Sequence, residues 1–337
     1  MAAECVGIVG ATGAVGSRLL SILEERRFPV GELRPFASER SLGQQISFGG
    51  QSSGCRVLEP GCFDGLDYVF FDASDEISKD WVPEALRSGA RVIDNSAVYR
   101  LEEGVPLVVP EVNASDLIHA VKSGKLLFSG PNCSTVQLVA ALQPLRRLAG
   151  LRRVAVSTYQ SVSGAGTAAM KELEGQVTGA GSAEVFPHRI AFNLIPKIGK
   201  VQSDGFTSEE KKLMQESRKI LGLPELKIVA TAVRVPTLIS HAESVFVELD
   251  AEVSPEQARE AWSATPGIVL MDDTENDLYP MNANTANRDG VAVGRVRRDP
   301  SVEHGLGFWV VSDNLRKGAA LNAVQIAESI RAAVVGH

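Results

Sequence analysis

The chain has 337 residues and is poor in cysteine, histidine and aromatic residues. Its four cysteines show neither a CxxC pair nor the spacing of a disulfide framework, which favours a reduced, cytoplasmic setting. The five histidines stand away from the cysteines, so we expect no metal site. There is no apolar run of membrane-spanning length and no basic segment leading into an apolar one at the start. The sequence therefore predicts neither a membrane span nor a signal peptide.

Basic clusters are also missing. Lys and Arg number 34 against 41 Asp and Glu, for a formal net charge of −7, which speaks against a nucleic-acid partner. What remains is the composition of an ordinary soluble protein, with 44% hydrophobic and 22% charged residues. Its length is large for one core and suits two domains.

The first part of the chain alternates between strand-like and helical patterns. It opens with an apolar strand, a glycine turn and a helix whose buried side carries Val15, Leu19, Leu20, Ile22 and Leu23. Further strand-like runs follow at 33–38, 66–74, 91–97, 106–112 and 125–130. This alternation predicts an α/β domain with a Rossmann-like, doubly wound parallel sheet.

The pattern then changes to long, alternating, valine-rich runs, which predict an α+β domain with a mixed sheet. These runs lie at 151–163, 226–236, 242–250, 290–299 and 306–314. A helix over 207–224 opens with a capping box, Thr207 and Glu210, and stops at Gly222. Another helix starts near Thr135, and we expect Pro144 to bend or end it.

A glycine turn after the first strand is the main cofactor signal. Gly10, Gly13 and Gly16 form GxxGxxG, where glycine lets the backbone approach a pyrophosphate at a helix N-terminus. A tight strand-to-helix turn would need glycine as well, so the motif alone leaves both interpretations open.

The end of the second strand bears on cofactor choice. Ser38, Arg40 and Ser41 are donors suited to the 2′-phosphate of NADP, arginine especially because of its planar fork. Glu39 is the discordant residue, because an acidic side chain in the pocket would repel that phosphate and favour NAD. A polar surface loop is the alternative interpretation of this stretch.

Cys133 lies between Pro-Asn and Ser-Thr, at the point where helical periodicity begins. A helix N-terminus lowers a thiol pKa and so favours the nucleophilic thiolate, and its amides can stabilise an oxyanion. A buried structural cysteine is the alternative, because cysteine is among the residue types most often buried.

Other residues could complete such a site. His241 is the best proton partner of the five histidines, since His119, His188 and His304 lie in polar or loop-like contexts and His337 is terminal. Arg234 suits a substrate carboxylate. Gln160 precedes a small-residue turn through Ser163 and Gly164, and Glu209 and Lys212 share a helix face. The alternatives are that His241 is an exposed loop histidine and Arg234 a surface arginine, and that Glu209 and Lys212 form only a solvated ion pair.

These motifs together resemble aspartate-semialdehyde dehydrogenases over nearly the whole chain, in the family's order and spacing. The resemblance rests on "GATGAVG", "ASERSLG", "PLVVPEVN", "GPNCST", "YQSVSGAG", "NLIPKIG", "VRVPTLISHAES" and "DNLRKGAALNAVQIAE". It implies NADPH-dependent reduction of L-aspartyl 4-phosphate to L-aspartate semialdehyde and phosphate, through a Cys133 thioester, by a cytoplasmic homodimer or homotetramer without a metal.

The resemblance also implies a role for each matching residue. Cys133 matches the nucleophile, His241 the general acid/base and Gln160 the residue that positions the intermediate. The substrate-binding set implied in this way is Arg100, Asn132, Gln160, Glu209, Lys212 and Arg234. The cofactor-binding set is Gly10, Thr12, Gly13, Ala14, Val15, Ser38, Arg40, Ser41, Ser163, Gly164 and Asn314.

The domain organisation follows from the same resemblance. An NADP-binding domain would comprise 1–132 and 315–337, because the last helix returns to it, and a catalytic and dimerisation domain would comprise 133–314. The chain departs from the family pattern at "DNSAVYR", which has fewer serines than usual, and at Glu39. The alternatives are N-acetyl-glutamyl-phosphate reductase, whose cysteine and histidine contexts look different, and a non-catalytic paralogue, which would be expected to lose the nucleophile.

Overall fold

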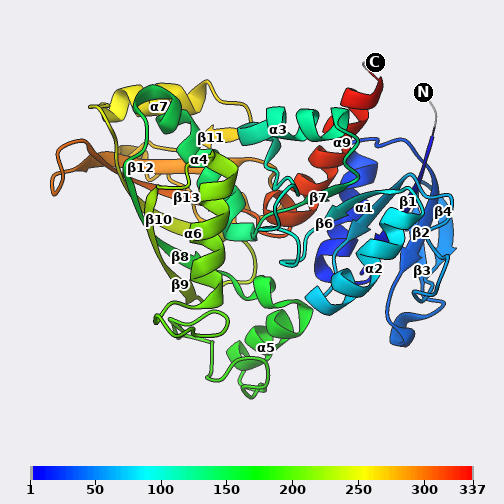
Figure 1. The fold of residues 1–337 in the computed structure, drawn as a ribbon. Helices are drawn as coiled ribbons and strands as arrows, with labels where there is room; N and C mark the ends of the chain where they lie inside the picture. The colour runs from blue at the N-terminus through cyan, green and yellow to red at the C-terminus, as the bar shows by residue number, and fades with distance from the viewer. Residues whose placement is uncertain (1–2, 336–337) are drawn as a thin grey trace. The chain divides into compact units, whose positions relative to one another are not determined.

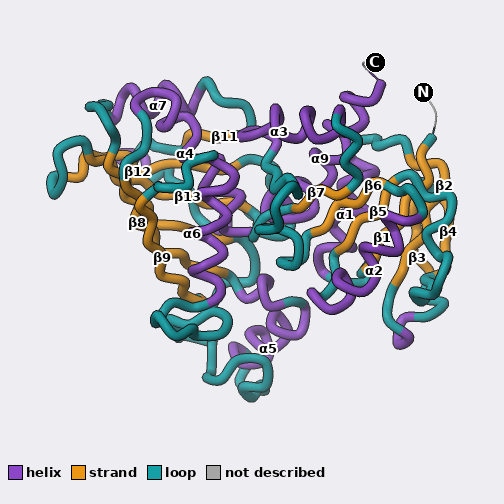
Figure 2. Tube along the Cα trace, viewed as in Figure 1, coloured by secondary structure: helices purple, strands orange, loops and turns teal. Residues whose placement is uncertain are grey.

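The computed structural model describes residues 3–335 and divides them into two compact units. Unit 1 is the described part of Met1–Pro131 and Ala319–His337, and unit 2 is Asn132–Gly318. The chain therefore leaves the first unit, builds the second and returns. Figures 1 and 2 show the two units as ribbon and as tube.

Unit 1 is built on a five-stranded parallel sheet, as predicted for the first part of the chain. In spatial order its strands are β2 (Val30–Phe36), β1 (Glu4–Val9), β5 (Tyr68–Phe71), β6 (Arg91–Asp94) and β7 (Leu127–Ser129). A separate hairpin, β3 (Gln45–Phe48) and β4 (Gln51–Gly54), was not predicted. Its alternating residues are largely polar and exposed, so it lacks the apolar signal of a core strand.

Helices cover both faces of this sheet, which makes it doubly wound. One core cluster joins side chains of α1 (Ala14–Glu25), α3 (Pro110–Lys122) and α9 (Leu321–Val335) to alternate residues of the strands. A second cluster packs α2 (Asp75–Arg87) against the other face. Ala320, just before α9, and Ala323, Val324 and Ala327 within it are fully buried in the first cluster.

The run 106–112 was predicted to be strand-like, and that prediction is wrong. Leu107 forms only an isolated bridge with Ser129, and α3 begins at Pro110. Proline at the first helical position is favoured because its fixed φ suits the helix and its missing N–H is not needed there.

Unit 2 contains a six-stranded mixed sheet, again as predicted. In spatial order its strands are β11 (Ile268–Leu270), β12 (Val291–Asp299), β13 (Gly305–Ser312), β10 (His241–Glu248), β8 (Arg153–Gln160) and β9 (Lys227–Arg234). The pairs β11–β12 and β8–β9 are parallel, and the other three pairs are antiparallel.

One face of this sheet is covered by helices α4 (Cys133–Ala149), α6 (Ser208–Leu221) and α7 (Pro255–Ser263) (Figure 1). Helix α4 lies against α6, α7 and the strands, and twelve of its residues in succession, from Ser134 to Leu145, are buried. The indole Nε1 of Trp262 donates to the Ala141 carbonyl, 2.8 Å away, and so ties α7 to α4. Helices α5 (Thr167–Val177) and α8 (Asn282–Thr285) complete the unit.

In one helix of unit 2 burial overrides the local sequence preference, and in another the local sequence is sufficient. Helix α4 does not end at Pro144 but continues to Ala149, because burial on nearly all sides outweighs the lost backbone hydrogen bond. Helix α6 has the predicted capping box, with Thr207 Oγ1 accepting from the Glu210 N–H, and it ends at Gly222, whose φ is +62°. No helix within residues 3–335 is long and apolar enough to cross a membrane.

Candidate active site

A row of three polar side chains crosses the sheet of unit 2. His241 on β10 pairs in register with Gln160 on β8, and Gln160 pairs in register with Arg234 on β9. Adjacent strands lie roughly 4.8 Å apart, so the three residues are immediate neighbours. Each is at least 94% buried, at relative exposures of 0%, 1% and 6%. The row therefore joins an imidazole, an amide and a guanidinium at the end of three strands.

Cys133 lies at the first helical position of α4, two residues earlier than the periodicity indicated. Asn132 is the N-cap, and its Oδ1 accepts from the Ser134 N–H at 3.0 Å. The Gln160 amide donates a short hydrogen bond to Ser134 Oγ, which links the row to the start of α4. Placement at the helix start, beside the electropositive end of the dipole, favours a thiolate.

Helix α6 contacts this helix start through two carboxylates. Glu209 Oε1 accepts from Asn132 Nδ2 at 2.8 Å and from Gln160 Nε2 at 3.3 Å. Glu216 Oε2 accepts from the backbone N–H of Asn132 at 2.7 Å. Lys212 Nζ lies 3.7 Å from the other Glu209 oxygen, so the predicted pair on one helix face is present and faces the site.

The Arg234 guanidinium is anchored at one end. Its Nη1 donates to the Ser161 carbonyl at 2.6 Å, and its Cζ lies 5.9 Å from the centroid of the Phe186 ring. Burial lowers the pKa of Arg234, while the charges of Glu209 and Cys133 act in the opposite direction. A guanidinium retains its charge despite such a shift, so the site presents a fixed cation.

His241 is held by the segment after β8. Its Nδ1 accepts from the Ser161 N–H at 3.1 Å, which leaves Nε2 as the nitrogen that carries hydrogen in the neutral ring. Nε2 is buried and has no hydrogen-bond partner among the described residues. Burial, and secondarily the Arg234 charge, lowers the pKa of His241 to about 3. The imidazole is therefore neutral at physiological pH in the protein alone.

Gly164 lies directly against the side chains of Arg234 and His241. A Cβ added there would be 3.0 Å from Arg234 Nη1 and 3.1 Å from His241 Nε2. Ser163 and Asn314 form a second polar group nearby, in which Asn314 Oδ1 accepts from Ser161 Oγ at 3.2 Å and from the Ser240 N–H at 3.0 Å. Asn314 Nδ2 donates to Ser163 Oγ at 3.0 Å. This network orients the segment that holds the imidazole.

The predicted pyrophosphate loop of unit 1 is a tight strand-to-helix turn that depends on glycine. Gly10 has φ +89°, and a Cβ there would lie 2.2 Å from the Asp72 carbonyl oxygen. A Cβ at Gly16 would lie 2.2 Å from the Gly10 oxygen. Gly13 is the N-cap of α1, Ala14 and Val15 follow it, and no side chain caps the helix. Amides at an uncapped helix start suit a phosphate, so these residues fit a dinucleotide.

Beside this loop, unit 1 has a cavity of about 360 Å³. Ser38 and Glu39, just after β2, line it together with Gly10. The other lining residues are Val9, Ala37, Val57, Leu58, Ala73, Ile77 and Trp81. Arg40 is exposed on the short 3-10 turn Glu39–Ser41, and the Ser41 hydroxyl lies 3.5 Å from Thr12 Oγ1. An apolar slot with polar groups at its mouth suits a nucleoside.

Arg100, also in unit 1, is buried and oriented by backbone carbonyls. Its Nε donates to Gly130 O at 2.9 Å and its Nη2 to Asn95 O at 2.5 Å. Asp94 precedes it on β6 and accepts from the Ser78 and Ser96 hydroxyls, although burial raises the pKa of Asp94 overall.

Several residues of the site were not singled out from the sequence. They include Ser134, Ser161 and Ser240, which form hydrogen bonds with Gln160, His241 and Asn314 respectively. Ser240 has a positive φ of +72°. Glu216 had one detectable signal, its position two helical turns after Glu209 on the same face of α6. Glu243 is fully buried two residues after His241, and burial raises its pKa well above the usual range.

The remaining histidines lie elsewhere. His119 is on α3, and His188 and His304 are in loops, while His337 falls outside the described residues. Among residues 3–335, no group of three or more His, Cys, Asp and Glu side chains is arranged to hold a metal ion.

Comparison with known protein families gives matches in both parts of the chain. Residues 5–120 match the model described as semialdehyde dehydrogenase, NAD binding domain. Residues 142–317 match the model described as semialdehyde dehydrogenase, dimerisation domain.

Individual proteins match over almost the full length. The aspartate-semialdehyde dehydrogenase of Aquifex aeolicus is 47% identical over 330 residues, covering 96% of both chains. A crystal structure of aspartate semialdehyde dehydrogenase II from Vibrio cholerae, complexed with ASA, superposes with a TM-score of 0.94 at 41% identity, covering 98% of this chain and 99% of that one. The Candida albicans aspartate semialdehyde dehydrogenase with NADP superposes with a TM-score of 0.78 at 26% identity, covering 99% and 100%.

Proposed function

The chain belongs to the aspartate-semialdehyde dehydrogenase family of oxidoreductases, and from this premise we propose the reaction and the residues that carry it. The reaction is the reversible reduction of L-aspartyl 4-phosphate by NADPH to L-aspartate 4-semialdehyde and phosphate, in the pathway to lysine, threonine, methionine and isoleucine. Its cellular location is the cytoplasm, where the four cysteines, none of them in a disulfide, would remain reduced.

One observation supports this proposal above the others. Cys133 starts α4, and the hydrogen bond from Gln160 to Ser134 joins that start to the row formed by His241, Gln160 and Arg234. In the proposed mechanism the Cys133 thiolate attacks the acyl phosphate carbon, phosphate leaves and a thioester remains on the sulfur. Hydride addition to the thioester carbon would leave an oxyanion on that carbon, and the His241 Nε2–H, as general acid, hydrogen-bonds to this oxygen. The C–S bond then breaks, which releases the semialdehyde and returns Cys133 as the thiolate.

The charged residues bind the two ends of the substrate. Arg234 holds the α-carboxylate with the edge of its guanidinium that does not bind the Ser161 carbonyl, and Glu209 receives the α-amino group. Arg100 and Lys212 bind the phosphate. Asn132 and Gln160 hold the carbonyl in line with the sulfur, since both already contact the start of α4.

A bound nicotinamide dinucleotide supplies the hydride. Unit 1 would hold its pyrophosphate on the amides of Gly10, Thr12, Gly13, Ala14 and Val15, and its 2′-phosphate through Ser38, Arg40 and Ser41. Ser163, Gly164 and Asn314 of unit 2 would contact the nicotinamide. A Cβ at Gly10 or Gly16 would collide with backbone oxygens, so glycine permits the tight turn that brings the start of α1, which no side chain caps, next to β1; this supports the pyrophosphate assignment.

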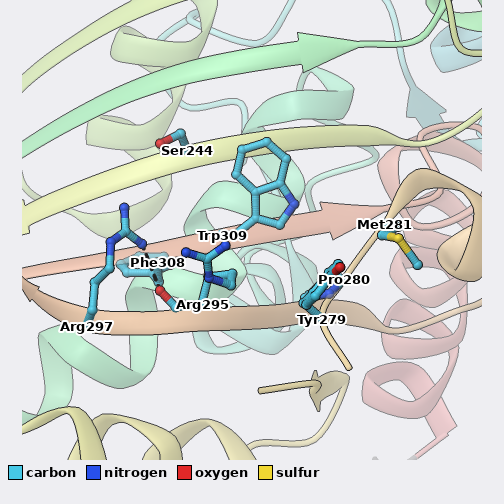
Figure 3. A pocket seen from close by; sticks show the side chains of 8 residues that line it. All are labelled: Ser244, Tyr279, Pro280, Met281, Arg295, Arg297, Phe308 and Trp309. Carbon is cyan, nitrogen blue, oxygen red and sulfur yellow. Dashed lines mark hydrogen bonds between the residues drawn. The ribbon is translucent and has the colours of Figure 1, made fainter. Parts of the chain in front are cut away.

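The protein functions as a homodimer, and the uncovered face of the unit 2 sheet is its interface. Tyr159 and Trp309 lie on that face with ring centroids 5.2 Å apart, and Arg297 lies 5.2 Å from the Phe246 ring. A cavity of about 400 Å³ opens beside Trp309, lined also by Arg295, Tyr279 and Met281 (Figure 3). Aromatic, methionine and arginine side chains are the types enriched in protein interfaces.

The test is phosphate-dependent reduction of NADP+ by L-aspartate semialdehyde, measured for the native chain and for Cys133→Ala. We expect activity that requires phosphate and falls to background in the variant, while circular dichroism shows an unchanged fold. Cys55→Ala, a change at a buried cysteine of unit 1, is the matched control and should keep activity. A folded native chain inactive with both NADP+ and NAD+ would refute the proposed reaction.

A further inference from the structure

We propose that Glu216 is a positioning residue for the nucleophile: its carboxylate fixes the backbone of Asn132 and thereby sets where Cys133 begins α4. The proposal rests on the nucleophilic role of Cys133 stated above. Glu216 touches neither substrate nor cofactor in it; it positions Cys133 through Asn132, and its charge lies close enough to affect the thiol.

The contact is direct and shielded from water. Glu216 Oε2 accepts from the Asn132 N–H at 2.7 Å, and the Glu216 residue is 1% exposed. A helix start leaves four N–H groups without intrahelical partners. Glu216 binds the Asn132 N–H, and the Asn132 side chain binds the N–H of Ser134. Both residues that flank Cys133 are therefore fixed by side-chain acceptors.

Helix α6 is itself tied to the strand that carries Arg234. Glu210 Oε2 accepts from the Thr207 N–H in the capping box, and its Oε1 accepts from the Ala232 N–H on β9 at 2.9 Å. Ala232 is two residues from Arg234. Three acidic residues of one helix thus connect β9, β8 and the start of α4, through Glu210, Glu209 and Glu216 respectively. Helix α6 therefore sets the position of Cys133 relative to the row of His241, Gln160 and Arg234.

The charge of the Glu216 carboxylate also affects the ionisation of Cys133. The carboxylate binds an N–H one peptide unit from Cys133, so its negative charge opposes formation of the thiolate. A charge-assisted hydrogen bond is worth roughly twice a neutral one, which favours a carboxylate where geometry has to be fixed. Changing the carboxylate to an amide should therefore keep the hydrogen bond to the Asn132 N–H but make the Cys133 thiol easier to ionise. These two different responses make the proposal testable.

The experiment compares E216Q with E216L in the full chain. Glutamine keeps an oxygen acceptor and removes the charge, whereas leucine removes both at similar volume. For E216Q we expect kcat within about fivefold of native, and an iodoacetamide alkylation profile of Cys133, followed on its own peptide by mass spectrometry, that moves to lower pH. For E216L we expect kcat about a hundredfold lower with KM little changed, because Arg234 still binds the substrate.

Gln215→Leu, an exposed position on the same helix, is the matched control and should leave kcat and the alkylation profile native. An unchanged alkylation profile in E216Q overturns the proposal, and so does a folded E216L that keeps native kcat. If E216L does not fold, the E216Q profile decides alone. Since alkylation needs no turnover, these outcomes are separate from failure of the proposed reaction, which the Cys133→Ala assay reports.

Discussion

His241 and Gln160 occupy directly opposed positions on the antiparallel strands β10 and β8. Gln160 is at the same time the parallel register partner of Arg234 on β9, so β8 is the centre of the row. A shift of any of these strands by one residue would turn its side chain to the other face of the sheet. Valines along the same faces, such as Val245 opposite Val156, are buried and hold that register.

The position of Arg234 predicts a binding defect when it is replaced. Arg234→Lys would lose the proposed bidentate contact with the substrate carboxylate as well as the hydrogen bond to the Ser161 carbonyl. We expect the KM for L-aspartate semialdehyde to rise about tenfold to a hundredfold with a smaller change in kcat. Steady-state kinetics would check this, with Arg152→Lys at a half-exposed surface ion pair as control. An unchanged KM would refute the role of Arg234.

Glu39 predicts an effect on cofactor preference, since it lines the cavity after β2 while Arg40 is exposed on the adjoining turn. Removing its charge in Glu39→Gln should tighten binding of 2′,5′-ADP about threefold to tenfold, because repulsion of the 2′-phosphate is relieved. Binding of 5′-AMP, which lacks that phosphate, should not tighten. Titration calorimetry with both nucleotides measures the difference, and the exposed Glu103→Gln should change neither affinity. Equal effects on both ligands would show that Glu39 does not face the 2′ position.

Gly164 predicts a steric limit. The Cβ of Gly164→Ala would lie 3.0 Å from Arg234 Nη1 and 3.1 Å from His241 Nε2, so both groups must move by a few tenths of an ångström. We expect kcat/KM to fall about tenfold to a hundredfold while the melting temperature stays near native. Ala168→Ser, at an exposed position on α5, should have no effect in the same assays. Full activity in Gly164→Ala would mean that the imidazole and guanidinium have more room than their positions indicate.

Glu243 predicts a dependence of stability on pH. Its carboxyl is fully buried, neither oxygen makes a well-formed hydrogen bond among the described residues, and burial, countered in part by the Gln137 side chain, raises its pKa well above 4.5. The folded state therefore keeps a proton that the unfolded state releases above pH 4.5. The contribution to stability is present below that pH and is lost as pH rises towards the folded pKa, by about 1.4 kcal/mol per pH unit.

Glu243→Gln cannot ionise in either state, so its advantage in stability over the native chain should be small at pH 5 and larger at pH 8. Thermal unfolding of both proteins at the two pH values measures this, and the exposed Glu275→Gln should show no such trend. A difference that stays constant or shrinks with pH would mean that Glu243 is ionised in the folded protein.

Local sequence was enough to predict the individual helices and strands. Apolar periodicity and the glycine turn predicted β1 and α1, Thr207 and Glu210 predicted the start of α6, and alternating valines predicted the strands of the mixed sheet. Each of these depends on residues within a few positions of one another, so propensity, capping and side-chain period suffice to predict them. The order of motifs also sufficed to indicate the family, which the comparisons confirmed.

Which side chains come together in the site depends on the packing of segments that are distant in the chain. His241, Gln160 and Arg234 come from three strands far apart in the chain, and no local pattern encodes the register that aligns them. The contact of Glu216 with Asn132 depends on how α6 packs against α4, and the burial of Pro144 outweighed the helix-ending preference that its sequence position predicted. Such relationships arise from burial and packing of distant segments, whose energies exceed local preferences and cannot be read from neighbouring residues.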